Sequence, residues 1–191
     1  MSEVRQTEYQ NINILKNLLE NKGIDTSQWG KGEAKTIEHL QREIEEQESI
    51  LLIDDSGELI RRVMIVGADI YHTFQDGKTY RLKEDRQVFN DGRERRRDYG
   101  HAVSEKMKID EIPEAAMIRG IREELGIGGN IELTKTLADE KNIFSPSYPG
   151  LNSLYIRYEF EVLLSDEQFN IEGYVEEQDD KKTYFIWEEI A

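Results

Sequence analysis

The chain has 191 residues, which is enough for one domain with a full core and a modest extension. Its formal net charge of −15 opposes general binding to nucleic acid or anionic membranes, because both need Lys and Arg to neutralise phosphate. It has no cysteine, which excludes disulfide frameworks, zinc–thiolate sites and thiol catalysis. No apolar run approaches the roughly 18 residues of a membrane span, and the N-terminal stretch lacks an apolar signal core, so we expect a cytoplasmic protein.

Apolar residues at helical spacing predict two helices near the N-terminus, over residues 11–20 and about 33–48. Trp29 lies in the turn-rich link between them, where packing is the more frequent role for a large aromatic residue. Two helices bury too little surface to fold alone. We therefore expect residues 1–48 to form a helical extension of a domain that spans residues 49–191.

Strands are expected along most of the remaining chain. Apolar or alternating segments predict them over residues 49–53, 59–66, 79–89, 93–98, 131–137, 154–164 and 181–187. Hairpin turns are expected at residues 54–57 and 90–92. Because strands stand on both sides of one amphipathic helix, the sequence predicts an α/β fold in which a mixed sheet lies between helices.

That helix is predicted over residues 113–125. Pro113 suits the first helical turn, and Gly126 is a natural C-terminal stop. Ile118, Ile121 and Leu125 recur at helical spacing, and we expect them to form one buried stripe.

Two neighbouring glutamates on this helix are candidates for metal binding. At about 100° per residue, Glu123 and Glu124 project to either side of position 120. Carboxylates held on a rigid helix suit a hard cation such as Mg²⁺, which prefers one or two carboxylates together with phosphate oxygens. A solvated acidic face without bound metal is the alternative, and it is the usual meaning of Glu-Glu.

The segment that begins at Glu105 resembles the Nudix box, G-x5-E-x7-R-E-U-x-E-E-x-G-U, in which U is aliphatic. Glu111 falls on the first Glu, Arg119 on the Arg, and residues 123–127 on the ending E-E-x-G-U. Two positions depart from the pattern. Glu105 stands where the first Gly belongs, and Gly120 stands where the Glu after the Arg belongs.

The resemblance implies a Nudix-like fold and the hydrolysis of a nucleoside diphosphate linked to another moiety, with Mg²⁺ or Mn²⁺ on the box glutamates. Glu105 is a candidate for the carboxylate that Gly120 lacks, and Glu176 or Glu177 for a base from outside the box. The implied catalytic residues are Glu123, Glu124, Arg119 and Glu177, and the implied metal ligands are Glu123, Glu124 and Glu105. From the sequence, Gly120→Glu is expected to restore a carboxylate and to tighten metal binding.

Substrate-binding candidates lie outside the box. On a strand, Arg93, Arg95 and Arg97 would share one face and suit phosphate recognition, with ion pairing to acidic residues as the alternative. Tyr148 and Phe144 would stack on a base, unless their loop packs with a buried aromatic residue instead.

Two functions therefore remain open. The first is a metal-dependent hydrolase of a nucleoside-diphosphate-linked or related pyrophosphate compound, favoured by the intact Arg119, Glu123 and Glu124. The second is a catalytically weak or inactive Nudix-fold module for nucleotide binding or protein interaction, favoured by Gly120 and Glu105. The expected partner is a small nucleotide or pyrophosphate substrate, and a homodimer stays open.

Overall fold

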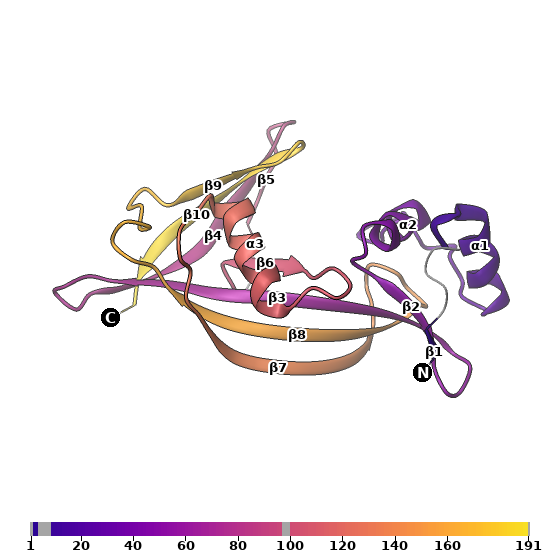
Figure 1. The fold of residues 1–191 in the computed structure, drawn as a ribbon. Helices are drawn as coiled ribbons and strands as arrows, with labels where there is room; N and C mark the ends of the chain where they lie inside the picture. The colour runs from indigo at the N-terminus through magenta and orange to yellow at the C-terminus, as the bar shows by residue number, and fades with distance from the viewer. Residues whose placement is uncertain (1, 4–8, 97–99, 191) are drawn as a thin grey trace. The chain divides into compact units, whose positions relative to one another are not determined.

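The computed structural model describes residues 2–3, 9–96 and 100–190 (Figure 1). The chain folds into two compact units. The first unit comprises Met1–Ile65, Lys106–Glu111 and Asp139–Arg157, and the second comprises Val66–Glu105, Ile112–Ala138 and Tyr158–Ala191. The boundary predicted after residue 48 is not a boundary between these units, because the first unit continues through Ile65.

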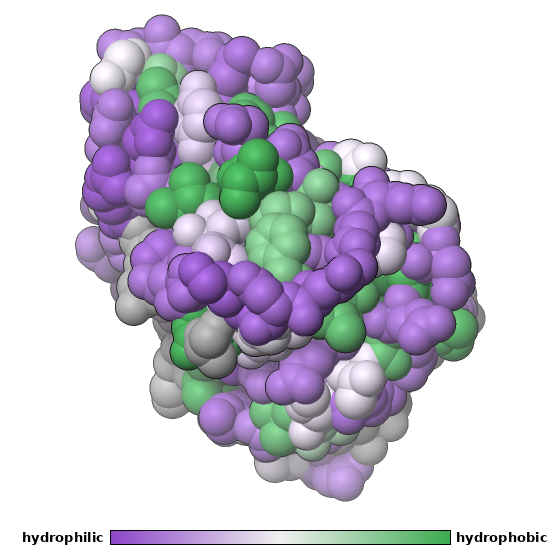
Figure 2. All heavy atoms as spheres, turned by 90° about the vertical axis from the view of Figure 1, so that its left-hand side faces the viewer, coloured by the Kyte–Doolittle hydropathy of each residue, from purple (hydrophilic) through white to green (hydrophobic). Residues whose placement is uncertain are grey.

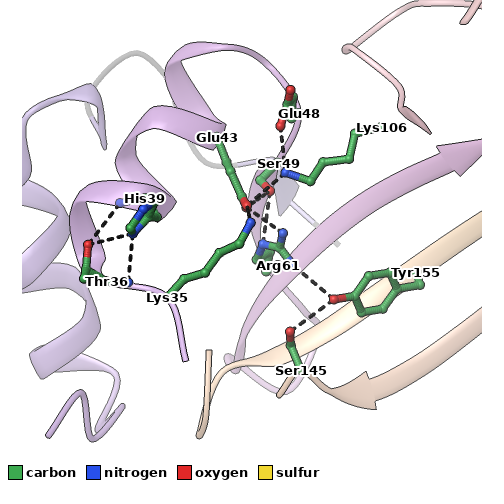
Figure 3. Close-up of polar contacts among 10 residues, drawn as sticks. All are labelled: Lys35, Thr36, His39, Glu43, Glu48, Ser49, Arg61, Lys106, Ser145 and Tyr155. Atoms are coloured by element: carbon green, nitrogen blue, oxygen red, sulfur yellow. Dashed lines mark hydrogen bonds and ion pairs between the residues drawn. The ribbon is translucent and has the colours of Figure 1, made fainter. Parts of the chain in front are cut away.

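Two capped helices belong to the first unit. Helix α1 (Ile12–Asn21) begins after Asn11, whose side chain accepts hydrogen bonds from the first free backbone N–H groups. Helix α2 (Ile37–Glu45) has a reciprocal cap between Thr36 and His39 (Figure 3). The first predicted helix is confirmed, and the second is shorter than predicted at both ends.

A small antiparallel sheet completes the first unit. Strand β1 (Ser2–Glu3) pairs with β2 (Ile50–Ile53), which pairs with the beginning of β3 (Leu59–Thr73). The predicted hairpin is present, and Asp54 closes its turn by accepting the N–H groups of residues 56 and 58. The helices and this sheet share one core, made of Tyr9, Leu15, Leu19, Leu40, Ile44, Leu51, Leu59, Tyr148 and Leu151. The N-terminal helices therefore pack on the same core as this sheet.

A buried charge network joins α2 to β3 within the first unit (Figure 3). Glu43 accepts hydrogen bonds from Arg61 at 2.6 Å and from Ser49 at 3.0 Å. Lys35 and Lys106 reach its other oxygen at 2.7 and 2.9 Å. Burial alone would raise the pKa of Glu43, but Arg61 and Lys106 outweigh it and hold the pKa below its ordinary value.

The second unit is built on an antiparallel ladder. In it the end of β3 pairs with β4 (Thr79–Phe89), β4 with β10 (Lys181–Glu189), and β10 with β9 (Tyr174–Glu177). Short strand β5 (Glu94–Arg95) pairs with β4, and β6 (Val103–Lys106) pairs with β3. Helix α3 (Pro113–Leu125) lies next to β9.

Two long strands complete the fold. Strand β7 (Leu133–Phe144) pairs with β8 (Asn152–Leu163), and β8 also pairs with β3. The N–H of Leu164 donates to the carbonyl of Tyr71, and Arg61 donates to Tyr155, so β8 runs parallel to β3. With antiparallel and parallel pairs present, the predicted α/β class with a mixed sheet is confirmed.

Several strands differ from their predicted extents. Strands β3 and β7 are longer than predicted, and the strand expected over residues 93–98 is only β5, while residues 97–99 lie outside the described part of the chain. Strands β6 and β9 are not predicted by the sequence, because each is four residues long and mostly polar. No helix in the described ranges has the length and apolar character needed to cross a membrane.

Glu43→Gln should lower the free energy of unfolding at neutral pH by about 3–5 kcal/mol, because Arg61 would keep a buried charge without its counter-ion. The folded-state pKa of Glu43 is lowered from 4.5, so its contribution is complete above that pH and is lost as the pH falls towards the folded value. Urea unfolding of the wild-type protein and the Glu43→Gln variant is measured between about pH 7 and about pH 3. The difference between their free energies of unfolding should shrink in acid. The control is Glu45→Gln, a change at an exposed position of the same helix. If the effect of Glu43→Gln on the free energy of unfolding did not depend on pH, the role of the ionised Glu43 would be contradicted.

Candidate functional site

Helix α3 has the bounds that its end signals predict. Pro113 occupies the first helical turn, and Gly126 ends the helix in the left-handed conformation at φ 67°. The N–H of Gly126 bonds to the carbonyl of Arg122. Local chemistry alone thus fixes where the helix begins and ends.

The buried face of α3 is rotated from the expected stripe. Ile121 and Leu125 are buried as predicted, but Ile118 is only half-buried. Met117 and Gly120 are buried in its place, and with Ile121 they follow the i, i+3, i+4 spacing of one helix face. Position 120 therefore faces the interior of the second unit.

The two positions that depart from the box pattern lie against each other. A Cβ atom built on Gly120 would stand 3.1 Å from the Cβ of Glu105 and 3.5 Å from Cγ1 of Val103. Glycine at 120 therefore lets strand β6 approach α3 closely, with the Glu105 stem in the space that a side chain at 120 would need.

One arginine connects two carboxylates at this contact. Nη1 of Arg119 lies 3.2 Å from Oε2 of Glu123 and 3.4 Å from Oε1 of Glu105. The Glu123 side chain is 61% exposed, whereas those of Arg119 and Glu105 are each 23% exposed. Glu124, at the edge of the buried face, is half-buried. The result is a partly open acidic face on which the Arg119 guanidinium contacts both Glu105 and Glu123.

Carboxylate oxygens are the donors that Mg²⁺ and Mn²⁺ prefer, so the residue types on this face fit such a cation. Among the described residues, no three His, Asp or Glu side chains are already grouped to hold a metal ion. Binding a cation at this face would therefore require these carboxylates to move closer together, with further ligands coming from substrate or water.

A second polar cluster in the same unit escaped the sequence analysis. His101 bridges Asp69 and Glu159, with Nδ1 3.3 Å from Asp69 and Nε2 3.2 Å from Glu159. Arg81 also binds Asp69, at 2.7 Å, and donates to the carbonyl of Gly100. The available signal was an acidic residue, Asp69, inside the mostly apolar run of residues 63–71 in β3.

The predicted phosphate-binding arginines contact residues of β4 and the adjoining turn. Both Arg93 and Arg95 lie near the ring of Phe89, at 5.0 and 5.6 Å from its centre. Arg93 pairs with Asp91 at 2.7 Å, and Arg95 donates to Oε1 of Gln87. Arg97 lies outside the described residues.

The neighbouring Arg96 forms an ion pair with Asp85, so at this position the arginine pairs with an acidic residue of the chain.

Glu177, the candidate base, is the last residue of β9, the strand that contacts α3. Its side chain is exposed and lies 2.5 Å from Nζ of Lys182. This hydrogen bond lowers the pKa of Glu177, so the carboxyl is ionised at neutral pH. An ionised carboxylate is the form that a base requires.

Tyr148 belongs to the core of the first unit and offers no open ring face for stacking on a base. The residue is wholly buried, Trp29 packs against its ring at 5.0 Å, and the Arg61 guanidinium lies 4.9 Å from the ring centre. Burial also raises the pKa of the Tyr148 hydroxyl. The alternative of a packed loop with a buried aromatic residue is the one observed, and the side chain of Phe144 lies outside the described part.

No protein-family model and no curated protein matches this chain. Solved structures to which it is similar include an Ap4A hydrolase from C. elegans, at 13% identity over 66% of this chain and 79% of that chain, with a TM-score of 0.39. The NUDIX domain of Shewanella oneidensis NrtR complexed with ADP ribose follows at 12% identity over 66% and 71%, with a TM-score of 0.38. A NUDIX-family hydrolase from Clostridium perfringens matches at 15% identity over 66% and 80%, with a TM-score of 0.34. All three TM-scores are below 0.5, so nothing about family or activity follows from these matches.

Gly67→Ala should destabilise the protein by about 1–3 kcal/mol, because the new Cβ would meet Cδ2 of His101 at 2.9 Å. Bonds to Asp69 and Glu159 prevent that ring from moving aside. Thermal unfolding measures the effect, and Gly128→Ala is the control, since no described heavy atom lies within 4 Å of its added Cβ. The cost should shrink in a His101→Ala background, and an undiminished cost there would show that the contact is not its cause.

Proposed function

We propose that the carboxylate face of α3 makes this protein a hydrolase of nucleoside-diphosphate-linked or related pyrophosphate compounds, dependent on Mg²⁺ or Mn²⁺. The observation that carries this proposal is the contact between Glu105 and Gly120. Two departures from the box pattern that look like separate losses in the sequence occupy facing positions in space.

The departures are reciprocal. The box pattern has Gly at position 105 and Glu at position 120, whereas this chain has Glu at 105 and Gly at 120. Because the two Cβ positions are only 3.1 Å apart, one side chain fills the space and the other position stays open. We infer that the carboxylate normally carried by the helix comes here from β6, so that the acidic face keeps its charge.

In this proposal Glu105, Glu123 and Glu124 hold the cation, which when bound neutralises the charge of the pyrophosphate. Arg119 orients Glu105 and Glu123, as its two contacts support. Glu177 takes a proton from the attacking water, for which its ionised state is suited.

Arg93 and Arg95 are proposed to bind substrate phosphate. Arg93 is highly exposed, and its present partner Asp91 is an exposed turn residue, so exchanging this pair for a phosphate costs little.

The alternative, a nucleotide-binding or protein-interaction module that hydrolyses weakly or not at all, is favoured by one observation. Among the described residues the carboxylates are not gathered into a three-ligand group, and Arg119 already neutralises part of their charge. The two functions can be distinguished by the effect of a divalent cation, because only the hydrolase requires one for its activity.

The reciprocal exchange can be tested by a double-mutant cycle. Glu105→Gly should weaken Mn²⁺ binding and hydrolysis, because it removes the relocated carboxylate. Gly120→Glu alone should destabilise the fold rather than improve the site, since the new stem crowds Glu105 and places two carboxylates together. This corrects the benefit that the sequence suggests for that change.

The double variant Glu105→Gly/Gly120→Glu should recover both stability and Mn²⁺ binding towards the wild-type values. Calorimetry with Mn²⁺ and thermal unfolding measure the two quantities. Additive effects of the single changes would show that the positions do not substitute for each other. They would contradict the inference that Glu105 replaces the carboxylate missing at position 120.

Glu124→Gln should lower metal-dependent hydrolysis by orders of magnitude while leaving unfolding nearly unchanged, because it removes a charge but keeps the side-chain volume. Glu114→Gln in the first turn of the same helix is the matched control, since Glu114 pairs with Lys135 instead. The assay covers nucleoside diphosphate sugars, dinucleoside polyphosphates, ADP-ribose and nucleoside triphosphates with Mg²⁺ or Mn²⁺. Equal activity of the two variants would remove Glu124 from the site, and an inactive wild type would favour the binding module.

A further inference from the structure

A pocket of about 390 Å³ lies in the second unit, and none of its lining residues belongs to α3. Its walls come from the end of β3, the turn before β4 and the loop after β8. They consist of His72, Phe74, Gln75, Asp76, Asp166 and Phe169. Figure 2 views the side on which the β3–β4 turn projects in Figure 1, and hydrophobic side chains are interspersed there among hydrophilic ones.

Aromatic packing fixes the orientation of His72 in this pocket. The residue is only 1% exposed. Its ring stacks on Phe169 at 4.1 Å between centres and meets Phe74 edge-on at 4.6 Å. Its Nδ1 lies 3.0 Å from the backbone oxygen of Leu164. The imidazole therefore cannot turn to find other partners.

The hydrogen bond to Leu164 decides which ring nitrogen carries the proton. A carbonyl oxygen only accepts, so Nδ1 of His72 must donate, and in the neutral ring Nε2 is an acceptor. Nε2 is buried and has no hydrogen-bond partner within the described residues. The nearest charged atom is Oδ1 of Asp166 at 3.5 Å, which is also an acceptor.

Two acceptors thus face each other, and no donor of the described residues bonds to Nε2, although an unsatisfied buried acceptor costs about 1–3 kcal/mol. A ligand that brings N–H donors would satisfy both atoms at once. Asp166 is largely exposed, so its carboxylate can adjust to such a ligand.

We propose that this pocket binds a small organic cation through a primary ammonium group. An ammonium has three donors, which matches His72 Nε2, Asp166 and a further acceptor such as Asp76. Two carboxylates in the lining balance its charge, and the rings of Phe74 and Phe169 favour a cation beside them. The nearby cation Lys78 is directed to Glu189 at 3.8 Å, and the net charge of −15 attracts cations in general.

The test uses n-butylammonium as the probe and tetramethylammonium, which has no N–H donor, as its control. Calorimetric titration of the full chain is done at about pH 8. We expect saturable binding of butylammonium and at least about tenfold weaker binding of tetramethylammonium.

Matched variants assign the site. His72→Phe keeps an aromatic ring and removes Nε2, and Asp166→Asn removes the facing charge at an exposed position, so it should fold normally. Each should weaken butylammonium binding by about tenfold or more. Glu167→Gln makes the same charge change at the next residue, outside this pocket, and should leave the affinity unchanged.

Three results would overturn the proposal. The first is that butylammonium fails to saturate the wild-type protein. The second is that both probes bind equally well, which would exclude recognition through N–H donors. The third is a nitrogen NMR spectrum that shows Nε2 of His72 protonated at that pH without ligand, because its ion pair with Asp166 would then leave no unsatisfied acceptor.

Discussion

The buried carboxylate of Glu43 is the constraint on which the first unit depends. Taking this charge out of water is costly, and only several donors together offset the cost. Arg61, Ser49 and two lysines provide them, from segments far apart in the sequence. All must be in place at once, so the network accepts one arrangement of α2 on β3, whereas the neighbouring leucines and isoleucines would tolerate several. Apolar burial stabilises this unit, and Glu43 specifies its geometry.

In the second unit, a steric constraint has the corresponding role. Gly120 and Glu105 share one volume, so the residue allowed at either position depends on the other. A pattern read position by position counts two defects here. In space the two positions are in contact, and this contact is the basis for proposing that they exchange one carboxylate. A degenerate motif is therefore better judged by which of its positions touch than by how many of its letters match.

The parts of the fold that local chemistry determines were predictable. Pro113 and Gly126 mark both ends of α3, and Asp54 marks the first hairpin. The parts that depend on distant residues were not. Tyr148 looks like a loop aromatic in the sequence, and it is buried because Trp29 and Arg61 cover its ring. Strand β6 is too short and polar to show a period, yet it carries Glu105. For the same reason, the sequence placed Glu105 among the candidates without showing what it faces.

The Glu43 network and the contacts of Arg119 differ in what it costs to open them, and this bears on function. Glu43 and Arg61 are 6% and 3% exposed, so separating them leaves a charge stranded in the interior. Arg119 and Glu123 are 23% and 61% exposed, and a pair of this kind contributes only about 0–1 kcal/mol. A divalent cation attracts a carboxylate more strongly than one exposed guanidinium does. The contact of Arg119 with Glu123 is therefore compatible with a cation on α3, because it holds the carboxylate in position without binding it tightly.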